Sequence, residues 1–452
     1  MLQRIFTLLA ITTLTVPLHA QHKKLNYHLS GNADSGTYTY TLEQCIGYAL
    51  QHQPAIKQAH IDEQIARANR SIAVAGWMPQ VTGTANYQHY IELPTSFLNI
   101  NGTLTPVRTG IANTSTPGVA VTQNIFSNET LLASRAGNLN MQLASQNTRA
   151  TKIDLVANVS KAFYDVLLSV ERIHVYMDDT ARLRKNRDDA YHRFVSGVSD
   201  KVDLRQATIA INNSLTQLKT ATEELNARNA RLKALMGAPM ELNVAVTFDT
   251  AQMMRVTDID TNAVLHMEKR IEFEQLELTR KIQHLTTAYY NTGFLPSLSA
   301  FYNYNHQFLS KEFSELYNKA YPNALFGLQL SVPIFTGLRR LDNIHKARLQ
   351  EERIDWDEVN LKLNIYSEYR SALAGYKSNL YNFHTQAENV AMAREVYNIV
   401  KLQYNEGIKP YLDVIVAESD LQNSEINYLN ALFELLQSKV DLDKAMGNIV
   451  VE

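Results

Sequence analysis

Cysteine is almost absent from this chain, which contains one in 452 residues. Cys45 therefore has no partner for a disulfide within the chain, and a paired-cysteine metal site is excluded. It also lies too far from the predicted cleavage point at residue 20 to be the lipid-modified first residue of a lipoprotein. We expect Cys45 to be a small apolar residue on a helix, and the mature protein not to be lipidated.

The chain also lacks an excess of charge, since 43 Lys and Arg oppose 45 Asp and Glu for a formal net charge of −2. This balance argues against a nucleic-acid partner and against a polybasic membrane-surface protein. Motifs of enzyme chemistry are missing too: there is no His-Glu-x-x-His and no phosphate-binding glycine loop, and the 13 histidines are scattered. We therefore expect no enzyme activity, no metal and no cofactor.

Long apolar runs are missing beyond the first 20 residues. Residues 1–20 have the features of a secretory signal peptide: an early Arg4, an apolar run over residues 5–16 and a small residue, Ala20, at the end. That run is too short for a membrane-spanning helix, and no later stretch reaches 18 uncharged apolar residues. We expect a secreted chain without a transmembrane helix.

Proline and glycine are rare over two very long stretches. Residues 127–192 contain no proline and one glycine, Gly137. The stretch from residue 338 to about 403 also contains no proline, and its one glycine is Gly375. Both stretches have helical patterns. At 1.5 Å per residue, each predicts a helix of roughly 100 Å, far longer than the helices of compact domains.

What the chain does contain is one turn that occurs twice. Residues 194–207 and 404–417 share an aromatic residue, a glycine, an aspartate, an aliphatic residue and an alanine, each 210 positions apart. The same offset relates the Met-Gly pair at 236–237 to the pair at 446–447. We interpret each turn as the tip of a helical hairpin, and the common offset as an internal duplication.

The order of patterns is the same in both halves: opening helix, strand, loop, strand, long helix, tip and return helix. Thr41 and Gln44 predict a capping box for the first opening helix, and Pro54 should kink or break it. The predicted organisation is a signal peptide at 1–20, an irregular segment at 21–40, a first repeat at 41–237, a linker with a short strand at 238–261, a second repeat at 262–447 and a tail at 448–452.

The return helices, predicted from Asp203 and Asp413 onward, carry heptad patterns that indicate coiled-coil packing. Aliphatic residues recur every seven positions, and small residues occupy most of the accompanying positions, which favours close helix approach. The first helix has Leu204, Ile211, Leu218, Leu225 and Leu232 with Ala207, Ser214 and Ala221; the second has Val414, Leu421, Tyr428, Leu435 and Leu442 with Ala417, Ser424, Ala431, Ser438 and Ala445.

Four segments alternate between apolar and polar residues, at 80–91, 119–125, 297–308 and 324–334, and residues 92–116 are predicted to be a long loop. Their lengths and aromatic-bearing faces are typical of membrane-spanning strands. A soluble sheet covered by helices is the alternative. The residues expected to face lipid include Val81, Tyr87, Val119, Val121, Tyr302, Tyr304, Phe326 and Leu328.

Four strands cannot close a barrel alone, and an open sheet leaves unpaired backbone at its edges. A symmetric oligomer that pools its strands would close the sheet, and the helices would continue it as a hollow tube. The main rival interpretation is a secreted or periplasmic coiled-coil adaptor or scaffold without a channel. It explains the helices and tips, but not four amphipathic strands with aromatic faces.

Residues 40–447 resemble the TolC-type outer-membrane efflux proteins. The matching pieces are residues 42–50 before Gln53-Pro54, the strand-to-helix segments Ile125-Phe126 and 333–337, and the two tips. The resemblance implies a mainly α protein with a small antiparallel β part, assembled as a homotrimer with a twelve-stranded barrel in outer-membrane lipid and an α-helical barrel in the periplasm. It also implies an exit channel for efflux or type I secretion, with a periplasmic adaptor (membrane fusion) protein and an inner-membrane transporter of RND or ABC type as partners.

Within this interpretation the tips have two candidate roles. The hypothesis for adaptor docking concerns Gly197, Val198, Ser199 and Asp200 in one tip and Gly407, Ile408, Lys409 and Pro410 in the other. Bulky replacements of both glycines should then leave trimers intact and abolish export. Helix capping is predicted for Asp203 and Asp413, with an acidic ring at a closed tunnel mouth as the alternative. Polar contacts that constrict the tunnel are expected near Arg187, Asp188, Asp189 and Glu395.

Overall fold

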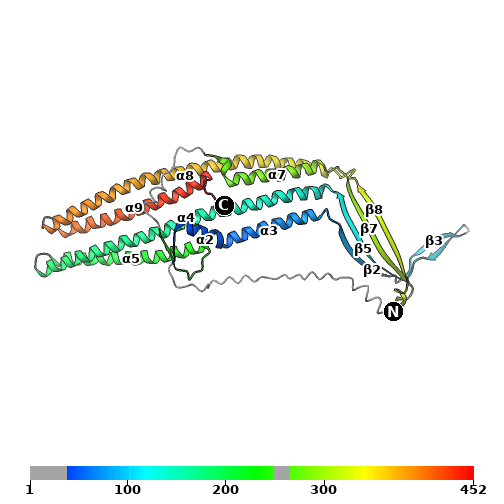
Figure 1. Ribbon diagram of the computed structural model, residues 1–452, viewed down its shortest axis with the longest axis horizontal. Helices are drawn as coiled ribbons and strands as arrows, with labels where there is room; N and C mark the ends of the chain where they lie inside the picture. Colours follow the sequence, from blue (N-terminus) through cyan, green and yellow to red (C-terminus); the bar gives the residue numbers. More distant parts are fainter. Residues whose placement is uncertain (1–37, 101, 248–264, 452) are drawn as a thin grey trace.

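The computed structural model describes residues 38–100, 102–247 and 265–451. The chain is elongated, with long helices side by side over most of its length and a sheet at one end (Figure 1). The predicted signal peptide lies outside the described residues, as do residues 21–37 and 248–261 of the predicted irregular segment and linker. No helix in the described ranges is long and apolar enough to cross a membrane.

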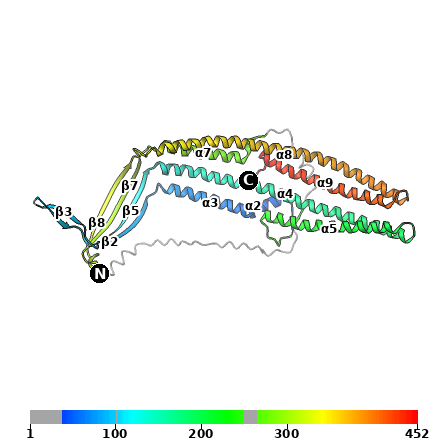
Figure 2. The ribbon, with the colours of Figure 1, turned by 180° about the vertical axis from the view of Figure 1, so that it is seen from behind.

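Two helices dominate the architecture, and both have the length that the sequence predicts. They are α4 (Asn128–Val195), with 68 residues, and α8 (Arg339–Asn405), with 67. Shorter helices lie end to end along each of them, as the ribbon shows from both sides (Figures 1 and 2). Along α4 lie α2 (Leu42–His52), α3 (Pro54–Ala75) and α5 (Lys201–Met236); along α8 lie α7 (Ile271–Asn291) and α9 (Tyr411–Met446).

The start of the first helix confirms the predicted capping box. The Thr41 hydroxyl accepts from the Gln44 N–H at 3.4 Å, and the Gln44 side chain accepts from the Thr41 N–H at 2.9 Å. Pro54 marks a break rather than a kink, because proline has no N–H to continue the ladder and is instead the first residue of α3.

The main sheet is antiparallel in the order β2-β5-β7-β8, with β2 (Gln80–His89), β5 (Asn113–Phe126), β7 (Ser297–Ser310) and β8 (Ala320–Ser331). Its register brings the predicted apolar residues onto one face. One row across the four strands is Val81, Val121, Tyr302 and Phe326, and the next contains Val119 and Tyr304. Val81 and Phe326 are each 68% exposed, so this chain leaves much of the face uncovered.

Two predictions about local structure are wrong, whereas the short strand predicted in the linker is present as β6 (Val244–Val246). The predicted loop at 92–116 contains a hairpin of β3 (Thr95–Ile100) and β4 (Thr103–Arg108), and β5 begins at Asn113. The Asn-Gly pair at 101–102 is the hairpin signal that the loop assignment overlooked. The irregular segment at 21–40 ends in β1 (Tyr38–Tyr40), which pairs in parallel with β6 (Val244–Val246) of the predicted linker.

Helix starts also differ from the predictions in the second half. The second repeat, predicted to open with a helix from residue 262, has a 3-10 turn at Met267–Lys269, and α7 begins only at Ile271. The second long helix begins at Arg339, after Gly337 and Leu338 adopt positive φ angles of 62° and 67°. These left-handed residues interrupt the helical backbone, so the segment 333–338 cannot be its first turn.

The core lies where both hairpins pack together. Phe163, Leu232, Tyr376 and Leu435 are among its fully buried side chains. Most heptad positions of the return helices are buried as predicted, which confirms the coiled-coil seams. They include Ala207, Ile211, Ser214, Ala221 and Leu232 on α5, and Val414, Ala417, Leu421, Ala431, Leu435, Leu442 and Ala445 on α9.

Candidate functional site

The two hairpin tips lie at the end of the molecule farthest from the sheet (Figure 1) and share one backbone conformation. Gly197 and Gly407 both have φ of 75°. Just after each glycine, a backbone N–H donates across the turn at 2.8 Å, from Val198 to the carbonyl of Arg193 and from Ile408 to that of Gln403. This is the hydrogen-bond pattern that ends a helix with a left-handed residue, and it explains why both copies keep glycine.

The outermost side chains of the tips are apolar. Val198 is 70% exposed and Ile408 is 72% exposed, and both stand at the turn of their hairpin. Asp200 and Pro410 are exposed beside them, whereas Ser199 and Lys409 are half-buried. Docking of a partner at these exposed side chains stays a prediction.

Asp203 and Asp413 are not helix caps. The helices begin at Lys201 and Tyr411, two residues earlier than predicted, because the extended backbone of an N-cap occurs at Asp200 and Pro410. Each aspartate lies in the first turn instead, where a carboxylate interacts favourably with the helix dipole. Burial, with the neighbouring Asp200, raises the pKa of Asp203, and Asp413 forms an ion pair with Lys409 at 3.1 Å.

Arg193 of the first tip contacts the aromatic residues of the second. Within the second tip the rings of Tyr404 and Tyr411 lie 5.4 Å apart, and the guanidinium of Arg193 lies over the Tyr404 ring at 4.5 Å. Arg193 also donates to the backbone carbonyl of Asn405 at 3.5 Å. Burial is the main cause that raises the pKa of both tyrosine hydroxyls. Ala190 and Ala207 of the first hairpin also belong to one small apolar cluster with Tyr404 and Tyr411.

The residues predicted to constrict the tunnel contribute little to contact between the hairpins of this chain. Arg187 pairs at 2.6 Å with the adjacent Asp188; Arg187 is half-buried and Asp188 is exposed. Asp189 reaches the other hairpin, where Lys401 lies 3.8 Å away. Glu395 is exposed on α8.

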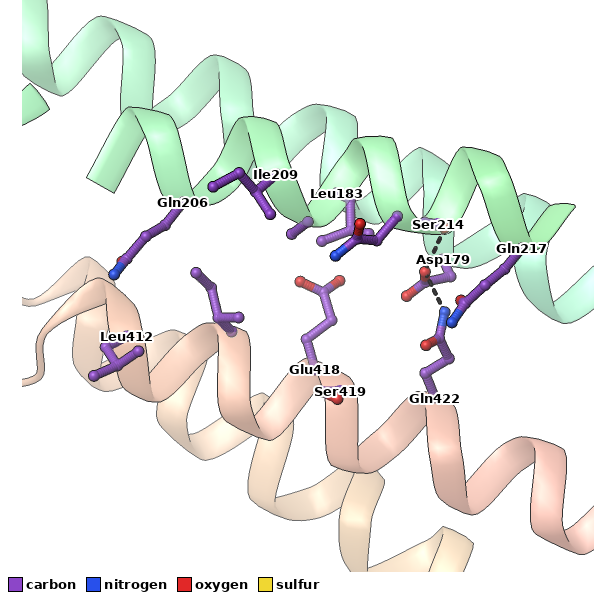
Figure 3. A pocket seen from close by; sticks show the side chains of 13 residues that line it. Asp179, Leu183, Gln206, Ile209, Ser214, Gln217, Leu412, Glu418, Ser419 and Gln422 are labelled. Atoms are coloured by element: carbon purple, nitrogen blue, oxygen red, sulfur yellow. Dashed lines mark hydrogen bonds between the residues drawn. The ribbon is translucent and has the colours of Figure 1, made fainter. Parts of the chain in front are cut away.

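A group of buried polar contacts between the hairpins involves residues that the sequence interpretation missed. We call this group the interhairpin cluster, and Figure 3 shows part of it. It comprises Asp179, Arg182 and Asn186 of α4, Ser214 of α5, Lys401 of α8, and Glu418, Gln422 and Glu425 of α9.

Hydrogen bonds cross between the hairpins at two buried carboxyl groups. The Asn186 amide donates to Oε2 of Glu418 at 2.7 Å. Asp179 Oδ2 accepts from Gln422 of α9 at 2.6 Å and from Ser214 of its own hairpin at 2.7 Å. Removing any of these donors would leave a buried carboxyl with one partner fewer.

Arg182 is the guanidinium that both buried carboxyls share. Its Nη2 lies 3.3 Å from Asp179 Oδ1 and its Nε lies 3.5 Å from Glu418 Oε1. A third carboxylate, Glu425, lies 3.8 Å from Arg182 but has a closer partner in Arg394 at 2.8 Å. The two buried carboxyls therefore share one guanidinium.

A cavity of about 330 Å³ opens beside the cluster, between α5 and α9. The Glu418 carboxyl projects into it, with Gln206 and Ile209 on one side and Leu412 on the other (Figure 3). Burial raises the pKa of Glu418 to about 7, and the Asp179 charge adds to the shift, while Arg182, Asn186 and Lys401 oppose it. Burial also raises the pKa of Asp179 and lowers that of Lys401.

Comparison with known proteins assigns the chain to a family. The family model described as "Outer membrane efflux protein" matches residues 45–238 and 288–448, which is most of the chain and includes both hairpins. The chain belongs to this family. The match confirms the resemblance predicted from the paired tips and strand-to-helix segments.

Individual members of the outer membrane efflux family are similar over nearly the whole length but at low identity. The "Outer membrane protein TolC" of Vibrio cholerae is 18% identical over 423 residues, covering 93% of each chain. The "Alkaline protease secretion protein AprF" of Pseudomonas aeruginosa is 21% identical, covering 89% of this chain and 86% of that one.

Solved structures show the same fold. A crystal structure of CusC superposes with a TM-score of 0.73 at 19% identity, covering 93% of this chain and 95% of that one. The Vibrio cholerae outer membrane protein VceC gives 0.69 at 16% identity, covering 90% and 96%. The predicted mainly α fold with a small antiparallel sheet is thereby confirmed.

One signal in the sequence could have located the interhairpin cluster. Polar residues recur at helical spacing on one face of each partner helix, at Asp179, Arg182 and Asn186 on α4 and at Glu418, Gln422 and Glu425 on α9. A polar stripe on a long helix usually faces solvent, so the sequence alone does not show that this one is buried. Its burial becomes evident only from the packing of α4 against α9.

Proposed function

We propose that this member of the outer membrane efflux family is the outer-membrane exit channel of an efflux or type I secretion system, which conducts its cargo passively. The observation that carries this proposal is the main sheet. Within the described residues, β2 and β8 each pair on one side only, and the face with Val81 and Phe326 is exposed. Membrane strands must have every backbone group paired, which an open sheet of four strands cannot achieve in lipid.

A homotrimer would complete the sheet. Because the four strands alternate in direction, β2 and β8 run antiparallel, and β8 of one copy can pair with β2 of the next as an ordinary antiparallel neighbour. Three copies would supply twelve strands, an even number within the range of outer-membrane barrels. The exposed face would then contact lipid, as predicted for the aromatic and aliphatic residues of the strands.

Exposed apolar stripes on the helices support the same assembly. On α3, Ile61, Ile65 and Ile72 are exposed on neighbouring turns. On α8, exposed apolar residues recur every seven positions, at Leu349, Trp356 and Leu363. A heptad stripe of this kind is typical of a helix that packs on another helix, and neighbouring copies would supply it.

We expect the mature protein to purify from the membrane fraction as a detergent-solubilised species with three times the mass of one chain. The reason is that closure of the sheet needs strands from more than one copy. Light scattering on the detergent complex measures the mass, and migration before and after boiling tests for a folded barrel. A protein that stays monomeric and soluble without detergent would favour the adaptor or scaffold interpretation.

The partners follow from the position of the two ends. The tips lie farthest from the sheet, so in the outer membrane they would reach into the periplasm, where a periplasmic adaptor could join them to an inner-membrane transporter of RND or ABC type that supplies the energy. Cys45 is fully buried on α2, which supports a chain without a lipid anchor at that residue. Relatives include a "Toluene efflux pump outer membrane protein" and a protease secretion protein, so the family likeness assigns no cargo.

Docking of the adaptor at the tips is best tested at the side chains, because Gly197 and Gly407 are needed for the turn itself. Replacing Val198 and Ile408 with aspartate puts charges on the exposed apolar ends. We expect trimers to form normally and export to fall by at least about 30-fold, since an interface anchor contributes about 2 kcal/mol or more. Export of a toxic compound by cells that depend on this channel measures the effect.

The matched control is the pair Val198→Ile and Ile408→Val, which exchanges the two apolar side chains and should leave export unchanged. Intact trimers with wild-type export in the aspartate variant would show that the adaptor does not bind at these residues. Loss of trimers would instead indicate that the tips stabilise the assembly.

A further inference from the structure

The interhairpin cluster buries more negative than positive charge at its centre. Asp179 is 1% exposed and Glu418 is 3% exposed, and both face the single guanidinium of Arg182. If both carboxyls were ionised, one negative charge would remain without a partner inside the contact. Burial of an unpaired charge is strongly unfavourable, so the packed arrangement favours a proton on the pair.

The surrounding charged groups remove this excess only in part, because Lys401 favours the ionised form of Glu418 but also lies near Asp189. On α8, Arg394 binds Glu425 of α9 at 2.8 Å, and Lys401 lies 3.8 Å from Asp189 of α4. The remaining polar groups that face the pair are the amide of Asn186 on α4, the uncharged Ser214, Gln206 and Asn213 of α5, Tyr397 of α8, and Gln422 and Tyr411 of α9.

The geometry also indicates where the proton lies. Oε2 of Glu418 accepts the Asn186 amide, whereas Oε1 is buried and makes no hydrogen bond among the described residues. Oε1 is 3.5 Å from Arg182 Nε, an ion-pair distance that is long for a hydrogen bond. Since the Glu418 carboxyl also projects into the cavity between α5 and α9 (Figure 3), a proton on Oε1 can exchange with solvent.

We propose that the interhairpin cluster is a proton-dependent switch, in which a proton shared by Glu418 and Asp179 holds the α4–α5 and α8–α9 tips of one chain together and its loss lets them separate. That the switch regulates a channel rests on the proposed function. The switch itself is a property of one chain. Every contact that crosses between the hairpins in this cluster uses one of the two carboxyls, Arg182 or Asn186.

The direction of the pH dependence follows from the burial. The packed tips raise the pKa of Glu418 from 4.5 to about 7. A carboxyl with a raised pKa binds its proton more tightly in the packed state, so packing is favoured in acid and loses that preference as pH rises from about 4.5 to about 7. Above that range both states are deprotonated and the preference no longer changes. Neutral and alkaline conditions should therefore favour separated tips.

The distance between the tips of one chain tests the switch. Cysteines replacing the exposed Val198 and Ile408 can carry spin labels, with the buried Cys45 replaced by alanine. Mixing the labelled chain with an excess of unlabelled chain before assembly leaves at most one labelled copy in most particles. Pulsed electron resonance in detergent then measures the separation between about pH 5 and about pH 8, the range that brackets the raised pKa.

We expect the short-distance population of the unmutated cluster to fall about twofold or more over this range, with a midpoint near the raised pKa. Glu418→Gln and Asp179→Asn each leave one carboxyl opposite Arg182, so both should keep the tips together at every pH. Glu434→Gln, the same change at an exposed position of α9, should behave like the unmutated cluster.

A distance that is independent of pH in the unmutated cluster overturns the proposal. The proposal also fails if the tip distance in Glu418→Gln changes with pH as it does in the control. If Glu418→Gln does not fold, the same test applies to Asp179→Asn. Because the measurement needs no transport, a failed switch leaves the exit-channel proposal standing, and a protein that is not a channel can still show the switch.

Discussion

Replacing Gly237 with alanine is expected to destabilise the protein by about 3 kcal/mol, whereas the same change at Gly197 should cost only about 1 kcal/mol. Both glycines lie just after the end of a helix and have positive φ angles, 67° at Gly237 and 75° at Gly197. They differ in their surroundings. A Cβ at Gly237 would lie 2.8 Å from the backbone oxygen of His52 and 2.9 Å from Cα of Gln53, but a Cβ at Gly197 would meet nothing within 4 Å.

The clash at Gly237 would occur where the end of α5 meets the break between α2 and α3. There the shorter helices lie end to end along α4. Gly237 follows the last residue of α5, and it abuts the break between α2 and α3. Gln53 spans this joint by donating to the carbonyl of Ala234 at 3.4 Å. Because the obstructing atoms are backbone, they cannot move as a side chain could, and α5 must withdraw from the joint.

Thermal unfolding followed by helical circular dichroism measures the two glycine variants side by side. Gly197→Ala carries the strain of positive φ without the clash, so the difference between the variants isolates the close approach. Gly447→Ala should resemble Gly237→Ala with a smaller loss, because its Cβ would lie 3.0 Å from the backbone oxygen of Lys269. Equal melting temperatures for the alanine variants at 237 and 197 would contradict this account.

The duplicated sequence made most of this joint predictable. The Met-Gly pairs at 236–237 and 446–447 mark the ends of α5 and α9, where both glycines adopt the left-handed conformation. Pro54 marked the break that α5 abuts. Such features are local, because a left-handed residue or a missing N–H limits the backbone whatever surrounds it. The length of the long helices was predictable for the same reason.

Features that depend on pairing were harder to predict. The strand β1 has three residues, too few for an alternating pattern, and its partner β6 lies about two hundred positions later. The helix starts at the tips were predicted two residues too late because Asp203 and Asp413 match a capping preference that their position does not use. A carboxylate is favourable both as a cap and in the first turn, so composition alone does not distinguish the two.

The interhairpin cluster was missed because its residues are ordinary on a solvated helix face. Asp179 and Glu418 are 239 positions apart, and only the packing of α4 on α9 removes both from water. The internal repeat gives no help, since the positions equivalent to Glu418 and Gln422 in the first repeat are Thr208 and Asn212. The cluster is therefore specific to the way in which the two unlike hairpins meet.

Replacing Arg182 with alanine should have the largest effect of any single change in this cluster. It removes the cation that Asp179 and Glu418 share, and breaking a buried ion pair costs about 3 kcal/mol or more when a charge is left behind. At about pH 8, where both carboxyls are ionised, we expect a larger population of separated tips in this variant than in the unmutated protein. Arg184→Ala, an exposed position on the same helix, is the matched control and should follow the unmutated protein at every pH.

The effect of Arg182→Ala should also depend on pH in a way that simple loss of packing does not. Without the guanidinium, the pKa of both carboxyls rises further, because the opposing cation no longer favours their ionised forms. At about pH 5 the two carboxyls can then both be protonated, and a neutral pair can still be accommodated in the contact. The spin-labelled tips should therefore close again on acidification, and tips that stay apart at every pH would assign Arg182 a packing role only.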